Sequence, residues 1–166
     1  MRILRENLWL PLVLFLAMLV DGQIATALAN LLPLNWHLVS HLLLILMLFT
    51  SIELADLTNF SVFVIIGFLY DAYYFHVIGI ATMIMPLLTL LVLKLNTIMM
   101  SNRWTRLLAV LVLVFLFELS SFLLASFLQL VNMDLGLFIV YSLAPSMLFN
   151  GGLLLFLQPL LEKIYL

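Results

Sequence analysis

The sequence predicts an all-α polytopic membrane protein with six transmembrane helices and both termini cytoplasmic. Of its 166 residues, 67% are hydrophobic and 8% are charged, and the mean hydropathy is +1.33. Soluble domains are roughly half apolar and a quarter charged, so this chain carries more apolar surface than a soluble core of its size would bury. No polar stretch is long enough to form a separate soluble domain. We therefore expect a single transmembrane domain over residues 1–166.

Composition also excludes several classes of function. The formal net charge of −2 is too small to suggest a nucleic-acid partner, and without cysteine no disulfide or thiolate chemistry is available. Neither Gly-x-Ser-x-Gly nor His-Glu-x-x-His occurs, so we predict neither an enzyme nor a cofactor. Arg2 and Arg5 precede an apolar run, as in a secretory signal, but further spans follow and we expect a retained first helix.

Hydropathy locates the spans. A helix needs about 20 apolar residues to cross a bilayer, and tilt or thinning accommodates other lengths. Six stretches meet this requirement, at residues 8–32, 36–52, 60–75, 77–93, 107–131 and 135–161. Residues 60–93 are too long for one helix, and the tyrosines of residues 73–76, followed by Gly79, mark the break. Tyrosine favours the membrane interface, and glycine relaxes the backbone.

The basic residues orient these spans. With six spans and a cytoplasmic N-terminus, every Lys and Arg falls on the cytoplasmic side, as the positive-inside rule requires: Arg2, Arg5, Lys94, Arg103, Arg106 and Lys163. The opposite loops, near residues 33–35, 76 and 132–134, contain no Lys or Arg. Five spans would place part of this set outside, so the charge pattern favours six.

Small and polar residues recur at helical spacing within several spans. The stripes are Asp21, Ala25 and Ala29; Gly79, Thr82 and Pro86; Glu118, Ser121, Ala125 and Gln129; and Ser142, Ser146 and Asn150. Such residues usually mark the face that a membrane helix turns toward another helix. We favour helix packing as their role, and a polar cavity for a ligand is the alternative.

Three acids lie within the spans, where a charge is costly and marks a functional or architectural position. Asp21 is expected near the outer interface. Glu118 lies midway along its span without an obvious basic partner, so we expect it to be uncharged. Asp71 is expected at the outer end of the third span, where it would accept hydrogen bonds from backbone amides that open the fourth and so fix the hairpin. Direct contact with a partner is the alternative for Asp71, and a proton relay would need all three acids.

The three histidines are all expected near the outer face. His37 and His41 would be one helical turn apart, and His76 follows the third span. Together with Asp71 they would suit zinc. Interfacial histidines more often bond to backbone or water, so we predict no metal.

The stretch from Gly67 through Asp71 to Gly79 resembles the signature region of the MreD family, which comprises small bacterial membrane proteins paired with MreC. The family pattern is a hydrophobic helix that ends in Gly-Leu-x-x-Asp, followed by Leu/Ile-Gly at the start of the next helix. Phe68 stands where leucine is usual. Residues 102–106, the Phe-Glu pair ending at Glu118 and residues 156–163 are also similar to MreD proteins of Gram-positive cocci.

This resemblance implies a non-enzymatic partner of MreC in the bacterial cytoplasmic membrane. Together the two would organise peptidoglycan elongation, including a RodA-type polymerase and a class B penicillin-binding protein, and so determine cell shape. The implied fold is similar to that of the substrate-binding subunits of energy-coupling-factor vitamin transporters. The alternative function is therefore such a subunit, for which Ala25 and Ala29 have the spacing of a docking motif. Its outer loops would be short for a lid over a vitamin.

Overall fold

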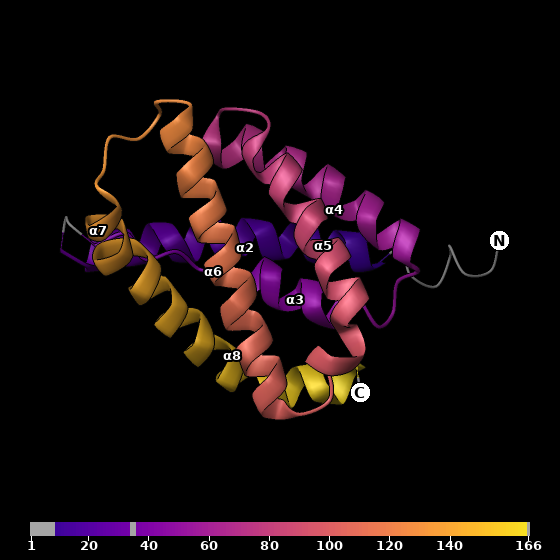
Figure 1. Ribbon diagram of the computed structural model, residues 1–166. Coiled ribbons are helices and arrows are strands. Elements are labelled where there is room, and N and C mark those ends of the chain that lie inside the picture. The colour runs from indigo at the N-terminus through magenta and orange to yellow at the C-terminus, as the bar shows by residue number, and fades with distance from the viewer. Residues whose placement is uncertain (1–8, 34–35, 166) are drawn as a thin grey trace.

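A computed structural model describes residues 9–33 and 36–165, which contain helices and loops but no strand (Figure 1). Five helical segments are long and apolar enough to cross a membrane: Trp9–Leu31, Asp56–Phe75, Ile80–Met99, Arg103–Phe127 and Leu135–Tyr165. The protein is therefore an all-α polytopic membrane protein, as its composition predicts. Arg2 and Arg5, whose cytoplasmic placement was expected, lie outside the described residues.

Five of the predicted spans match helices, with shifted ends. The helices are α2 (Trp9–Leu31); α4 (Asp56–Tyr70), which continues as a π-helical turn, η1 (Asp71–Phe75); α5 (Ile80–Met99); α6 (Arg103–Phe127); and a run of α7 (Leu135–Phe138), the π-helical turn η2 (Ile139–Leu143) and α8 (Ala144–Tyr165). Helices α4 and α6 begin four residues before the predicted spans. Hydropathy misses such ends because a helix continues through polar residues at the membrane interface.

The second predicted span is wrong over its first third. Residues 36–41 form neither helix nor strand, and helix α3 (Leu42–Thr50) has only nine residues. Residues 37, 39 and 41 bond in turn to Ser142, Ser146 and Asn150, and a rise of about 3 Å per residue between these contacts indicates an extended segment. An apolar run predicts burial, but its periodicity cannot distinguish a helix from a buried extended segment. The extended segment runs from exposed Trp36 to buried His41. Its polar backbone groups find partners within the protein, as irregular backbone at membrane depth must.

Helix α3 occupies the centre of the bundle. Leu43 through Thr50 are all buried, and α3 packs against α2, α5, α6 and α8 (Figure 1). A helix that is apolar on all sides belongs in such a surrounded position. The surrounding helices turn large apolar side chains outward, among them Leu16, Ile65, Leu87, Leu108, Phe156 and Leu160. In water this surface would cause association, whereas lipid covers it at no cost.

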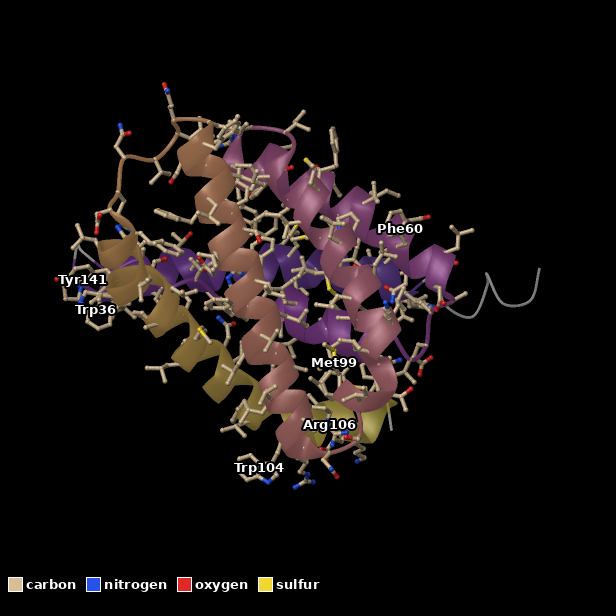
Figure 2. All side chains as sticks on the ribbon, in the orientation of Figure 1. Trp36, Phe60, Met99, Trp104, Arg106 and Tyr141 are labelled. Carbon is tan, nitrogen blue, oxygen red and sulfur yellow. The ribbon has the colours of Figure 1, made fainter. Side chains whose placement is uncertain are left out.

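The described basic residues gather at one end of the bundle, called here the basic end. Glu162, near the end of α8, accepts hydrogen bonds from Arg106 (2.7 Å) and Arg103 (2.8 Å) at the start of α6. The side chain of Arg106 also donates to the carbonyl of Met100, which follows α5. Figure 2 shows Arg106 and Trp104 here, with Trp36 and Tyr141 far away at what we call the opposite end.

Helices α4 and α5 pack against each other as a hairpin, and Gly67 lies at their contact. A Cβ atom at position 67 would lie 2.8 Å from the carbonyl oxygen of Ala81 and 3.0 Å from the Cα atom of Thr82. Both are backbone atoms that cannot rotate away. Glycine at position 67 therefore permits the close approach of the two helices.

We predict that Gly67→Ala lowers the unfolding midpoint of the detergent-purified protein, at a cost of about 1–3 kcal/mol from overpacking. The matched control is Gly152→Ala in α8, where an added Cβ meets nothing within 4 Å. That variant should gain about 0.5–1 kcal/mol from helix propensity. Equal effects of the two substitutions would contradict the packing role of Gly67.

Candidate functional site

Asp71 caps the start of α5. Its carboxylate accepts hydrogen bonds from the backbone N–H groups of Gly79 (2.8 Å), Ala81 (2.7 Å) and Thr82 (2.9 Å), and from the Thr82 hydroxyl (2.7 Å). The first N–H groups of a helix have no partner within it, and a carboxylate there also complements the helix dipole. These are the hydrogen bonds that the sequence predicted. Asp71 is fully buried, so its carboxylate has no surface left for contact with a partner.

The turn between Asp71 and its donors depends on two unusual backbone conformations. Gly79 has a φ of +129° and His76 a φ of +53°. A side chain at position 79 would be strained whatever space surrounded it, which accounts for the second glycine of the motif. His76 is exposed and does not lie in a site with the other two histidines.

Asp21 performs the same task for α3. One oxygen accepts the Leu42 N–H (2.7 Å) and the Ser40 hydroxyl (2.6 Å), and the other accepts the Leu43 N–H (2.8 Å). Asp21 is only 3% exposed. It is thus a buried cap of α3.

The polar stripe of the last helical run holds the extended segment, residues 36–41. Ser146 Oγ accepts the N–H of Val39 (3.0 Å), and Ser142 Oγ donates to the carbonyl of His37 (3.1 Å). Asn150 accepts the N–H of His41 (2.7 Å) and donates to the carbonyl of Val39 (2.8 Å). The stripe therefore bonds to backbone, and its regular spacing matches an extended segment that runs alongside η2 and α8.

The histidine of this segment reaches the buried glutamate. His41 Nε2 lies 2.8 Å from Glu118 Oε1, and both residues are buried. The expectation that Glu118 has no basic partner was wrong. His41 was placed near the outer face on the assumption of a helix. Because an extended chain advances about 3.3 Å per residue instead of about 1.5 Å, six extended residues carry His41 into the bundle.

A cavity of about 340 Å³ lies beside this pair, toward the opposite end. It is lined by the extended segment, the end of α4, the second half of α6 and the α7–η2 turn. The lining is mostly apolar and aromatic: His37, Val39, His41, Tyr70, Phe75, Phe117, Glu118, Ser121, Phe122, Ala125, Val131, Met133, Phe138 and Ser142. The size and lining are typical of a binding pocket with a few polar groups.

The structure thus separates the candidate residues into two places. Gly67, Asp71 and Gly79 form the α4–α5 hairpin, whereas Asp21 and Glu118 act on the extended segment. The roles of Ser40 and His41 were missed, because their partners are distant in sequence. Gln129 leaves the Glu118 stripe: it follows the end of α6 with a φ of +58°. Within residues 9–33 and 36–165, no three His, Asp or Glu side chains converge on a point that suits a metal ion.

We predict that Asp71→Asn destabilises the protein by about 2–4 kcal/mol, because the amide turns an N–H₂ group toward backbone donors and leaves buried N–H groups without an acceptor. Unfolding of the purified protein in detergent measures this. Asp134→Asn is the control, since Asp134 caps the Gly136 N–H at an exposed turn and should cost under about 1 kcal/mol. An Asp71→Asn variant as stable as this control would contradict the capping role.

Comparison with known proteins assigns the family. The family model for the rod shape-determining protein MreD matches residues 3–166. The cell shape-determining protein MreD of Streptococcus pneumoniae is 42% identical over 148 residues, which cover 89% of this chain and 90% of that protein. No solved structure matches. The Gly67–Asp71–Gly79 hairpin therefore lies in a chain that belongs to the MreD family of cell shape-determining membrane proteins.

Proposed function

We propose that this protein is a non-enzymatic assembly module of the bacterial cytoplasmic membrane that holds MreC. Through MreC it would position a RodA-type polymerase and a class B penicillin-binding protein during peptidoglycan elongation. Membership of a cell shape-determining family supports the biological role. The structural support comes from the hydrogen bonds that its buried polar side chains make.

The observation that carries this proposal is that the polar side chains of the spans bond mainly to backbone. Asp21 and Asp71 cap helices, and Ser142, Ser146 and Asn150 hold the extended segment. Groups committed to backbone in this way are not free to activate a substrate. They instead make a rigid framework, which is what a scaffold requires.

The cavity is the docking place that we assign to the partner. It opens toward the opposite end, which the positive-inside rule places at the outer face, where the extracellular part of MreC would begin. A segment of MreC close to its membrane helix would place apolar side chains in the cavity, where the aromatic lining offers contact. The short α4–α5 connection, residues 76–79, offers little to close a lid, and we see no observation that favours the transporter alternative.

The structure also supports six crossings. The extended segment begins beside Tyr141, whose carbonyl accepts the His37 N–H (2.9 Å) at the opposite end. The end of α3 lies beside Asn96, whose amide donates to the carbonyl of Ser51 (3.3 Å) near the basic end. Six extended residues and nine helical ones together span roughly 33 Å, about the thickness of a hydrocarbon core. We therefore infer that residues 36–52 cross the bilayer as a broken span.

The absence of cysteine permits a direct test of this topology. In whole cells, an impermeant maleimide should label Asn30→Cys and Asn132→Cys, while Asp56→Cys and Ser101→Cys should react only after permeabilisation. All four native residues are exposed. If the extended segment does not cross, the end of α2 lies inside, and labelling of Asn30→Cys would require permeabilisation.

Filling the cavity should release the partner. We predict that Ala125→Trp lowers the amount of MreC recovered with the purified protein by at least about tenfold and rounds or widens the cells. Leu123→Trp is the control, because Leu123 lies on the same helix and is 53% exposed on its outward face. Full MreC recovery with Ala125→Trp would exclude the cavity as the docking place. Failure of the unmodified protein to recover MreC would overturn the proposed function itself.

A further inference from the structure

The three buried acids differ in how many hydrogen bonds they receive. An ionised carboxylate offers roughly four lone-pair positions. Asp71 receives four hydrogen bonds and Asp21 receives three. Glu118 shares only one, between Oε1 and His41, among the residues that the structure describes. Buried acceptors are normally satisfied, so Glu118 stands out.

The missing partners of Glu118 lie on the side of the cavity. Glu118 lines it, and so does Ser121, which follows three residues later on the same face of α6. The Ser121 side-chain oxygen is enclosed and has no hydrogen-bond partner within the described chain, and the residue is 8% exposed. The second carboxylate oxygen of Glu118 is therefore left for a group that occupies the cavity, and the Ser121 hydroxyl would reach the same group by rotation of its side chain.

The walls of the cavity suit a positive charge. Phe117 meets the His41 ring edge-on with centroids 5.2 Å apart, and it meets Tyr70 likewise at 5.9 Å. Phe122 and Phe138 form a stacked pair with centroids 4.1 Å apart. Aromatic rings attract cations over their faces, most strongly where water is excluded. No Lys or Arg is among the lining residues, and the basic side chains that line the cavity are His37 and His41.

The geometry points to a subsite for an ammonium or guanidinium group on an apolar stem, with Glu118 Oε2 as the charge partner and Ser121 Oγ as a second acceptor. We take this group to be a basic side chain of the docked MreC segment, and this part of the inference rests on the proposed function. A charge-assisted bond to a buried carboxylate is stronger than a neutral one, so this contact would select and orient the segment beyond what the apolar walls provide.

The chemistry of the subsite is tested without any partner. The protein, in nanodiscs of phosphatidylcholine, is titrated with 4-fluorophenethylamine and, separately, with the uncharged 4-fluorophenethyl alcohol. Fluorine NMR reports binding above the background of empty nanodiscs. The amine should bind the unmodified protein at least about tenfold more tightly than the alcohol does, because only the ammonium pairs with Glu118.

Two variants locate that binding. Glu118→Gln, which keeps an acceptor for His41, should weaken amine binding at least about tenfold, and Ser121→Ala about threefold to tenfold. Asp56→Asn, at an exposed carboxylate in the first turn of α4, should leave it unchanged. Gel filtration and thermal unfolding establish that each variant is folded, and Ser121→Ala, a small change, keeps the test valid if Glu118→Gln does not fold.

The outcomes are separable. No amine binding, equal binding of amine and alcohol, or amine binding unaffected by both cavity variants would overturn the subsite, while the MreC recovery experiment with Ala125→Trp would stand unaffected. Amine binding that depends on Glu118, together with reduced MreC recovery by Glu118→Gln, supports a basic side chain as the ligand. If amine binding depends on Glu118 but MreC recovery does not, the result supports the same subsite with a free amine as its ligand.

Discussion

The bundle depends on satisfying the backbone of residues 36–41, an extended segment that enters the interior at Ser40 and His41. A helix satisfies its own N–H and C=O groups, but residues 36–41 cannot, and lipid offers no hydrogen bonds. Ser142, Ser146 and Asn150 supply partners for this backbone from one side. From the other side, Asp21 binds the Ser40 hydroxyl and caps the start of α3. Because these bonds tie α2 and α8 to the segment that leads into α3, they also determine where the central helix lies.

Two buried carboxylates also supply hydrogen-bond partners for backbone groups that would otherwise have none. Asp21 and Asp71 each gather the leading N–H groups of a helix, α3 and α5, which start inside the protein without water to solvate them. Burying an acid is costly, but several N–H donors and the positive end of the helix dipole offset the loss of hydration. Glu118 does not follow this pattern, since it lines a cavity and has His41 as its one hydrogen-bond partner within residues 9–33 and 36–165. The same residue type therefore has an architectural role in two places and a binding role, as we propose, in the third.

Whether the sequence predicts a hydrogen bond depends on how far apart the two bonded residues lie along the chain. The hydrogen bonds of Asp71 were predictable because its donors lie 8 to 11 residues away, across a turn marked by Gly79. The bonds of Asn150 to His41 and of Glu118 to His41 span 109 and 77 residues. Each stripe was visible as a helix face, but no rule of spacing tells which distant backbone such a face will meet.

Composition by itself determined that the chain lies in a membrane as helices, because 67% apolar residues leave no other way to bury their surface. Local patterns determined the hairpin of Gly67, Asp71 and Gly79, where close contact and a positive φ act within a few residues. Only the tertiary structure decided that residues 36–41 are extended. That conformation is stable because Ser142, Ser146 and Asn150 bind its backbone and Asp21 binds the Ser40 hydroxyl. The added rise per residue brings His41 to Glu118, and both line the cavity.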